Sequence, residues 1–292
     1  MTAQLIDGKA IAQCVRDEVA AEVSRRVAAG KSRPTLATVL VGDRPDSAAY
    51  VASKGKACQE LGMGSVSQNL PIDASQEQVE DLVKQLQSDR SVHGILVQLP
   101  MPSHINEERV LSLIGIEKDV DGFSPLNIGR LAQKGRDPLF VPCTPYGCIY
   151  LLEQAGVKIE GANAVVLGRS NIVGMPAALL LISRNATVTV CHSRTRDLPA
   201  TVREADILIA AIGRTEMVRG DWIKPGAAVI DVGINSVPDS TKKSGHRLVG
   251  DVNFNEAKEV AGWITPVPGG VGPMTIAMLM KNTLRAAQIQ EA

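Results

Sequence analysis

The sequence predicts an α/β protein of two domains. Its 292 residues are about twice the length of a common domain, and 45% of them are hydrophobic, enough to bury sizeable cores. Short apolar runs alternate along the chain with segments of helical period. Such alternation is typical of a parallel sheet covered by helices. Because it is most regular in the second half, we expect the second domain to be a Rossmann-like parallel sheet.

The first half carries two expected strands and three expected helices. Apolar residues recur every four positions from Ile11 to Val27, the stripe of an amphipathic helix, and Gly30 follows as its stop. Ser75 and Gln78 form a capping-box pattern at the start of another helix. Residues 115–143 are rich in Gly, Pro, Asp and Asn without a sustained period, which indicates a functional loop or a domain connection. The expected elements are a helix over 47–61 and buried strands over 36–42 and 93–100.

The second half alternates strands and helices. Thr144 and Pro145 are expected to be the N-cap and first residue of a helix that ends near Ala155. The other expected elements are strands over 163–168, 186–191, 206–213 and 227–234, and helices over 173–183 and 274–289.

Composition argues against several functional classes. Lys+Arg and Asp+Glu each number 31, so the net charge is zero, which disfavours nucleic-acid and polybasic membrane-surface binding. Aromatic residues make up only 3% and offer few platforms for stacking bases. No apolar run reaches the roughly 18–20 residues that span a bilayer. We therefore expect neither a nucleic-acid partner nor a membrane association.

The cysteines and histidines suggest neither disulfide bonds nor a metal site. Five cysteines without a CxxC pair indicate free thiols. Four histidines without HxxxH or HExxH spacing make a metal site unexpected. The first residues lack the charged and apolar segments of a signal peptide, so a cytoplasmic location is expected.

A glycine turn follows the first strand of the second half. Gly168, Ser170 and Gly174 stand in the pattern GxSxxxG, a variant of the dinucleotide fingerprint. Such a turn brings backbone N–H groups at a helix N-terminus to phosphate oxygens. A tight turn that binds nothing is an equally good interpretation of this motif alone.

The end of the next strand favours NADP over NAD. An acidic residue at this place reads the ribose 2′-hydroxyl, whereas arginine accommodates a 2′-phosphate. Ser193, Arg194 and Arg196 occupy it, and Arg169 in the glycine turn could bind the same anion. The alternative is a solvated basic loop.

Tyr50 and Lys54 stand four residues apart on one helix face. A tyrosine ring can stack on a flat heterocycle while the lysine meets its reactive end. A surface Tyr–Lys pair is the plainer interpretation, but Gln98 and Asp121 favour a site. Gln98 interrupts an apolar strand near its carboxyl end, where α/β sheets bind ligands. Asp121, in KDVDG with Asp119, could hold a ring amidine by paired hydrogen bonds.

Seven blocks together resemble the bifunctional methylenetetrahydrofolate dehydrogenase/methenyltetrahydrofolate cyclohydrolase family. They extend from about residue 43 to residue 280. The blocks are DSAAYVASKGKACQELG, GILVQLPMP, EKDVDGFSPLNIGRL, PCTPYGC, VVLGRSNIVGMP, IKPGAAVIDVGIN and ITPVPGGVGPMTIAML. One departure is the run Gly213–Met217, where the family often has a short Gly- or Pro-containing turn.

The resemblance implies two successive reactions in one-carbon metabolism and purine biosynthesis. NADP-dependent oxidation of 5,10-methylenetetrahydrofolate gives the 5,10-methenyl compound, and hydrolysis gives 10-formyltetrahydrofolate. It also implies a homodimer joined through the Rossmann-like domain, and a last helix that returns to the first domain. The implied domains are 1–143 plus 274–292, which binds folate and is catalytic, and 144–273, which binds NADP.

The resemblance also assigns site residues. Lys54 would be the catalytic lysine, Tyr50 would stack on the folate, Gln98 would partner Lys54 and Asp121 would anchor the pterin. The implied substrate-binding set is Tyr50, Lys54, Val97, Gln98, Leu99, Asp121, Pro268, Gly269 and Gly270. The implied cofactor-binding set is Gly168, Arg169, Ser170, Ile172, Val173, Ser193, Arg194, Ile234, Gly270 and Val271.

The hydrolytic step sets a demand on Lys54. Free lysine has a pKa of about 10.4, and a lysine base should titrate at about 7–8. A nearby carboxylate would oppose that shift, so we expect the neutral Gln98 rather than Asp121 as the direct partner. Two alternatives remain open: an NADP-dependent dehydrogenase of another small metabolite, and a nucleotide-binding sensor whose Lys54 is structural.

Overall fold

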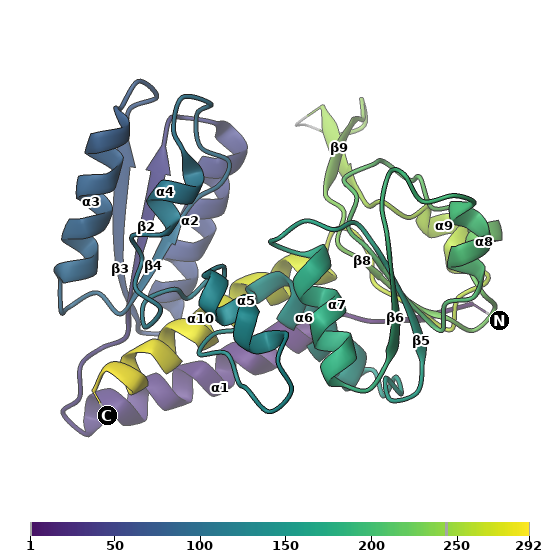
Figure 1. Ribbon diagram of the computed structural model, residues 1–292, viewed down its shortest axis with the longest axis horizontal. Coiled ribbons are helices and arrows are strands. Elements are labelled where there is room, and N and C mark those ends of the chain that lie inside the picture. The colour runs from purple at the N-terminus through teal and green to yellow at the C-terminus, as the bar shows by residue number, and fades with distance from the viewer. Residues whose placement is uncertain (1, 243–244, 292) are drawn as a thin grey trace. The chain divides into compact units, whose positions relative to one another are not determined.

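The computed structural model describes residues 2–242 and 245–291 and divides into two compact α/β units (Figure 1). The N-terminal unit comprises Gln13–Cys143 with the residues from Ile276 onward. The C-terminal unit comprises the residues up to Ala12 with Thr144–Thr275. The predicted α/β class and the return of the last helix to the first unit are therefore confirmed. Within the described residues, no helix is both long and apolar enough to cross a membrane.

The N-terminal unit is built on a parallel three-stranded sheet of order β3-β2-β4. The strands are β2 (Thr35–Val41), β3 (Gly64–Leu70) and β4 (Gly94–Val97). Helices α2 (Pro45–Glu60) and α3 (Gln76–Ser88) connect them and lie on opposite faces of the sheet (Figure 1). The α3 face is a core of buried aliphatic residues that includes Val39, Val83 and Ile95. This sheet directs the carboxyl ends of β2 and β4 to one edge.

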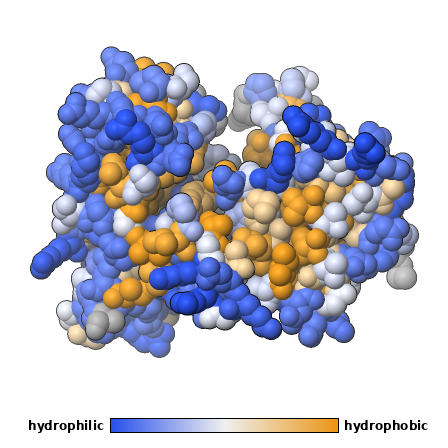
Figure 2. Space-filling view, in the orientation of Figure 1, coloured by the Kyte–Doolittle hydropathy of each residue, from blue (hydrophilic) through white to orange (hydrophobic). Residues whose placement is uncertain are grey.

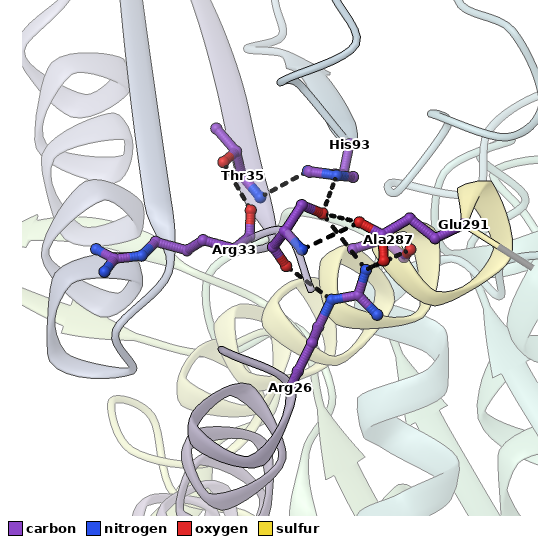
Figure 3. A network of polar contacts seen from close by, with 7 residues as sticks. Arg26, Arg33, Thr35, His93, Ala287 and Glu291 are labelled. Atoms are coloured by element: carbon purple, nitrogen blue, oxygen red, sulfur yellow. Dashed lines mark hydrogen bonds and ion pairs between the residues drawn. The ribbon is translucent and has the colours of Figure 1, made fainter. Parts of the chain in front are cut away.

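Two long helices belong to both units. The first residues of α1 (Gly8–Ala28) and of α10 (Val271–Gln290) lie in the C-terminal unit, and their remaining residues lie in the N-terminal unit. A polar network fixes the end of α10 (Figure 3). Arg26 donates to the carbonyl oxygens of Ser32 at 2.8 Å and Ala287 at 2.9 Å, and it pairs with Glu291.

His93 completes this network as a hydrogen-bond donor to a serine (Figure 3). The backbone N–H of Thr35 donates to His93 Nδ1 at 3.2 Å, so Nδ1 carries no proton and Nε2 does. His93 Nε2 therefore donates to Ser32 Oγ at 3.0 Å, and Ser32 donates to Glu291. A serine that accepts from histidine is not activated as a nucleophile, so this network is structural.

The C-terminal unit contains a parallel six-stranded sheet of order β1-β11-β8-β7-β5-β6. The chain passes from β5 to β6 on one side and to β7 on the other, which places the switch point of the sheet at β5. The strands are β1 (Gln4–Leu5), β5 (Asn163–Leu167), β6 (Thr187–Cys191), β7 (Ile207–Ala210), β8 (Ala228–Asp231) and β11 (Trp263–Ile264). A Rossmann-like parallel sheet is thereby confirmed.

The remaining elements of the C-terminal unit surround this sheet. Strands β9 (Asn235–Pro238) and β10 (His246–Val249) pair in antiparallel fashion. The helices are α6 (Cys143–Gln154), α7 (Gly174–Ser183), α8 (Leu198–Arg203), α9 (Phe254–Ala257) and the 3₁₀ turn Gly220–Trp222.

The structure corrects several details of the sequence prediction. β1 pairs with β11, so residues 2–12 belong to the C-terminal unit and not to the first domain. Thr144 lies inside α6 and is not its N-cap. Strand β3 was missed because its alternate residues are polar and exposed, as befits an edge strand. Two short helices of the N-terminal unit, α4 (Glu107–Leu111) and α5 (Pro125–Leu131), were also missed.

Candidate active site

The helix α2 carries Tyr50 and Lys54 one turn apart, as the sequence predicts. Tyr50 is 42% exposed, and Lys54 is partly buried. Lys56, two residues further, is exposed beside Glu60, with Nζ 3.8 Å from a carboxylate oxygen. The two lysines of this helix thus lie in different environments, and only Lys54 is held inside the unit.

Gln98 is the hydrogen-bond partner of Lys54. Lys54 Nζ donates to Gln98 Oε1 at 2.9 Å. Gln98 follows β4, where its backbone N–H bonds Val39 at 2.8 Å. Its Nε2 donates to the carbonyl of Leu99 at 2.8 Å, which leaves Oε1 directed at the lysine. The expected neutral partner is therefore in place.

The two carboxylates of KDVDG have different surroundings. Asp119 accepts the backbone N–H groups of Phe123 at 3.1 Å and Ser124 at 2.8 Å, together with the Asn127 side chain at 2.8 Å. Asp119 is buried and shapes the loop that leads into α5. Among the described residues, Asp121 has no such hydrogen-bond partners, and it acts on Lys54 through its charge.

Lys54, Gln98 and Asp121 form a group that we call the Lys54 cluster. Burial has the largest effect on the pKa values of its two titratable members, Lys54 and Asp121. It lowers the pKa of Lys54, although the charge of Asp121 works in the opposite direction. Burial also raises the pKa of Asp121 to about 6, against the attraction of Lys54 and with a smaller contribution from Asp119. Because desolvation disfavours each charged form, Lys54 has the environment of a lysine that loses its proton more readily than usual.

Cys143 is a buried neighbour of this cluster that the sequence analysis did not single out. Burial, with the charge of Asp121 adding to it, raises the pKa of Cys143 well above its usual range. The thiol donates to the carbonyl of Val120 at 3.4 Å, and Asn282 Nδ2 donates to Cys143 Sγ at 3.6 Å. A thiol kept neutral is a poor nucleophile, so Cys143 contributes apolar volume near Lys54. The sequence offered one signal for this buried thiol: Asn282, its hydrogen-bond partner, is a polar residue inside the largely apolar last helix.

The two glycines of the turn in the C-terminal unit, Gly168 and Gly174, have no space for a side chain. Gly168 has a φ of +111°, and a Cβ there would overlap the carbonyl oxygen of Ala211. A Cβ on Gly174 would overlap the carbonyl oxygen of Gly168. Ser170 Oγ accepts the N–H groups of Val173 at 3.2 Å and Gly174 at 3.3 Å, so it also caps the start of α7. The predicted strand–turn–helix is therefore present with the close approach that the pattern requires.

A cavity of about 540 Å³ opens beside this turn, at the carboxyl ends of β5, β6 and β7. Open α/β sheets bind ligands at this place, next to the switch point. Arg169 and Arg214 are the arginines that line it, and within the described residues no Asp or Glu does so. A cavity with this charge suits phosphate groups.

The cavity includes some of the predicted cofactor residues and not others. Arg194 lies outside its lining, and the Arg194 backbone N–H instead bonds His192 Nδ1 at 3.2 Å. The predicted residues that line the cavity are Gly168, Arg169, Ser170 and Ser193. Those that do not are Ile172, Val173, Arg194, Ile234, Gly270 and Val271. Residues that the sequence analysis did not assign to the cofactor are Leu167, Cys191, His192, Thr195, Leu198, Ala211, Ile212, Arg214 and Met217.

The predicted substrate-binding residues divide between the two units. Tyr50, Lys54, Val97, Gln98, Leu99 and Asp121 belong to the N-terminal unit, and Pro268, Gly269 and Gly270 belong to the C-terminal unit. The side chain of Val97 packs in the core of its unit, with 3% of the residue exposed.

The PGG segment is closely packed inside its own unit. Gly269 has a φ of +112°. A Cβ on Gly270 would come within 2.7 Å of Thr265 Cβ, and one on Gly8 would overlap the carbonyl oxygen of Gly270. Only glycine therefore fits this backbone.

Family models match almost the whole chain. Residues 6–121 match "Tetrahydrofolate dehydrogenase/cyclohydrolase, catalytic domain", and residues 142–291 match "Tetrahydrofolate dehydrogenase/cyclohydrolase, NAD(P)-binding domain".

Individual relatives are similar over the same length. The chain is 60% identical over 287 residues to Bifunctional protein FolD 2 of Arabidopsis thaliana, covering 98% of this chain and 96% of that protein. It is 57% identical to Bifunctional protein FolD of Moorella thermoacetica, covering 99% of this chain and all of that protein. A crystal structure of the Trypanosoma brucei methylenetetrahydrofolate dehydrogenase-cyclohydrolase, complexed with NADP cofactor and inhibitor, is 46% identical. It superposes with a TM-score of 0.96 and covers 99% of this chain and 98% of that one.

Proposed function

This chain belongs to the tetrahydrofolate dehydrogenase/cyclohydrolase family, and we propose that Lys54, Gln98 and Asp121 perform its hydrolytic chemistry. The enzyme oxidises 5,10-methylenetetrahydrofolate with NADP⁺ and hydrolyses the 5,10-methenyl product to 10-formyltetrahydrofolate. The observation that carries the proposal for the residues is the bond from Lys54 to Gln98 in surroundings that lower the lysine pKa.

Lys54 is the base of the hydrolytic step in this proposal. A neutral Lys54 Nζ accepts a proton as the oxygen of water bonds to the carbon that bridges N5 and N10. The hydroxyl group of this adduct then forms the formyl C=O bond as the bond from that carbon to N5 breaks, and the hydroxyl proton passes to N5. Gln98 Oε1 holds Nζ in place and adds no charge that would keep the amine protonated.

Asp121 and Tyr50 bind the folate in this proposal. A carboxylate can accept two parallel hydrogen bonds from the amidine edge of a pterin. Asp121 is free for this role because Asp119 takes up the neighbouring backbone N–H groups. The Tyr50 ring, exposed one turn before Lys54, offers a face for stacking. Val97, whose side chain is buried, and Leu99 contribute backbone atoms beside Gln98.

The C-terminal unit fits NADP on two observations of its own. Gly168 and Gly174 lack the Cβ that would fill the turn, and Arg169 and Arg214 supply positive charge in the adjoining cavity. When bound, NADP⁺ accepts the hydride in the oxidative step. Gly168, Arg169 and Ser170 would hold phosphate groups at the start of α7, and Ser193 and Arg194 would serve the 2′-phosphate.

The remaining assigned residues complete the proposal from the same unit. Ile172, Val173, Ile234, Gly270 and Val271 would contact the cofactor, and Pro268, Gly269 and Gly270 would form a backbone surface against the substrate.

The test is direct. The purified enzyme should reduce NADP⁺ only when 5,10-methylenetetrahydrofolate is added, and should hydrolyse 5,10-methenyltetrahydrofolate without NADP⁺. Reduction of NADP⁺ with another metabolite and no reaction with reduced folate would favour the alternative dehydrogenase. NADP⁺ binding without either activity would favour a sensor.

We further propose a cytoplasmic homodimer that joins through the Rossmann-like unit and supplies 10-formyl groups for purine biosynthesis. Free cysteines, four of them buried, support a reducing compartment. Figure 2 shows hydrophobic surface over α7, where Met175 and Ile182 are 37% and 54% exposed. Light scattering coupled to size exclusion should give twice the mass of one chain, and an Ile182→Glu variant should lower it.

A further inference from the structure

Asp251 lies at the centre of a group of hydrogen bonds that no sequence motif indicates. It follows β10 and is fully buried. Its Oδ2 accepts the backbone N–H groups of Ile212 and Gly213 at 2.7 and 2.9 Å. Its Oδ1 accepts the N–H of Arg214 at 2.8 Å and the side chain of Asn235 at 3.0 Å. Four N–H donors therefore meet two carboxylate oxygens.

Residues 212–214 and this carboxylate depend on each other. Three successive backbone N–H groups that point to one side form an anion-binding nest. Gly213, with a φ of +66°, allows the turn. A buried carboxylate is unfavourable unless hydrogen bonds satisfy it, and these donors do so. Loss of either carboxylate oxygen would leave at least one of the three N–H groups without its acceptor.

The same residues form part of the wall of the NADP cavity. Ile212 and Arg214 line it beside Ala211. Gly168 approaches the carbonyl oxygen of Ala211 so closely that any side chain would overlap it. The loop and the glycine turn are therefore fitted to one another, and the position of the Arg214 guanidinium depends on the shape of the loop.

A second buried carboxylate, Asp231, fixes Asp251 in turn. Asp231 ends β8 and pairs with Ala210 of β7 in the sheet. Its oxygens accept the N–H groups of Asp251 and Val252, both at 2.9 Å. The Asp231 and Asp251 side chains thus connect the ends of two central strands to the cavity wall.

We propose that Asp251 is a positioning residue for NADP, whose carboxylate holds residues 212–214 so that Arg214 meets a phosphate group of the cofactor. The inference rests on the proposed NADP site and extends it to a residue that does not line the cavity. It predicts that the charge of Asp251 governs cofactor affinity while the Lys54 cluster, in the other unit, works independently of it.

The experiment is Asp251→Asn, which preserves shape and removes one acceptor oxygen. Two of the four donors then lose their partner. We expect the dissociation constant of NADP⁺, measured by calorimetry, to rise at least tenfold. The KM for NADP⁺ should rise more than kcat falls, and hydrolysis of 5,10-methenyltetrahydrofolate should stay within twofold of wild type.

Asp206→Asn is the matched control in the same unit. Asp206 also accepts a backbone N–H, that of Asn163 at 2.9 Å, but it lies before β7 and outside the cavity lining. Its NADP⁺ affinity should equal that of wild type. Equal affinity in Asp251→Asn, or equal losses of both activities, would overturn the positioning role. Failure of wild type to bind NADP⁺ would instead overturn the proposed function.

Gly213→Ala keeps the proposal testable if Asp251→Asn does not fold. No atom lies within 4 Å of a Cβ at Gly213, so alanine adds only backbone strain at a positive φ. We expect a several-fold weaker affinity for NADP⁺ with a melting temperature close to that of wild type. Unchanged affinity in Gly213→Ala would count against the positioning role even if Asp251→Asn were insoluble.

Discussion

The Lys54 cluster and the NADP cavity use charged groups in opposite ways. Lys54 and Asp121 are enclosed, and burial moves both pKa values toward the neutral forms. In the cavity, Arg169 and Arg214 are exposed at strand ends beside a backbone turn. Proton transfer needs a group that can lose its charge near neutral pH, whereas binding a polyanion needs charges that persist. Each unit provides the environment that its proposed task requires.

The largest effect is expected for Lys54→Met, which should affect the Lys54 cluster and leave the NADP cavity intact. General-base catalysis contributes roughly 10²–10⁴-fold, so hydrolysis of 5,10-methenyltetrahydrofolate should fall by about that factor. Part of the hydride transfer should remain because that step depends on positioning rather than on a base. All of the NADP⁺ affinity should remain because the proposed NADP site lies in the other unit. The absorbance of the methenyl compound measures its hydrolysis, and calorimetry measures the NADP⁺ affinity.

Lys56→Met is the control for this variant. Lys56 lies on the same helix but is exposed, so both activities should stay at the wild-type level. Hydrolysis at the wild-type rate in Lys54→Met would remove Lys54 from the mechanism.

Arg169→Gln tests the NADP cavity, which Arg169 lines. A charged hydrogen bond contributes about 1.5–3 kcal/mol, so the dissociation constant of NADP⁺ should rise by roughly tenfold or more. The loss should shrink at high salt because screening already weakens the wild-type interaction. Arg184→Gln, which removes a surface pair with Glu153, should change nothing. An unaltered salt dependence in Arg169→Gln would contradict the role of this charge.

Two substitutions should shift the pH profile of hydrolysis in opposite directions. Gln98→Glu places a carboxylate on Nζ, raises the Lys54 pKa and moves the rising limb to higher pH. Asp121→Asn removes the charge that raises the Lys54 pKa, so the limb moves to lower pH while substrate binding weakens. Each pH unit of displacement changes the rate on the limb about tenfold. Shifts in the same direction would show that Lys54 is not the titrating group.

The smallest effect is expected at His93, which takes part in the structural network with Ser32 and Thr35. Burial, and then the charge of Arg26, lower the His93 pKa below 6.5 in the folded protein. Between that folded value and 6.5 the unfolded chain binds more protons, so stability is complete above pH 6.5 and falls as pH decreases.

His93→Asn should remove this pH dependence. The asparagine oxygen can still accept from Thr35 but does not titrate. Thermal melting between pH 5 and 8 should show a flatter profile for the N-terminal unit. At pH 5 the difference should be a few degrees, since a hydrogen bond of about 1 kcal/mol shifts melting by roughly 2–4 °C. Parallel profiles of melting temperature against pH for variant and wild type would contradict the assignment of this pH dependence to His93.

Much of the fold could be predicted because it depends on local pattern. The buried strands β2, β4, β5 and β7 are continuous apolar runs, and Ser75 with Gln78 forms the predicted capping box. Strand β3 escaped prediction because an edge strand needs apolar residues on one face only. β1 escaped because two residues carry no period, and only its pairing with β11 defines it.

The candidate site was predictable to a different degree in each unit. Lys54 and Gln98 could be paired because the family resemblance implies that pairing, and the structure joins them at 2.9 Å. The roles of Arg214 and Cys143 could not be predicted, because nothing in their local sequence shows that Arg214 faces a cavity or that Cys143 lies near a buried lysine. Their positions follow from the order of the strands and the return of α10.

The chain by itself determined the α/β class, the glycine turn, and the helix face that carries Tyr50 and Lys54, because these depend on residues within one or two turns of each other. Only the tertiary structure decided the pKa of Lys54, the roles that separate Asp119 from Asp121, and the binding of Asp251 to residues 212–214. Desolvation and convergent hydrogen bonds arise when segments far apart in sequence pack together, and no local pattern records which segments will meet.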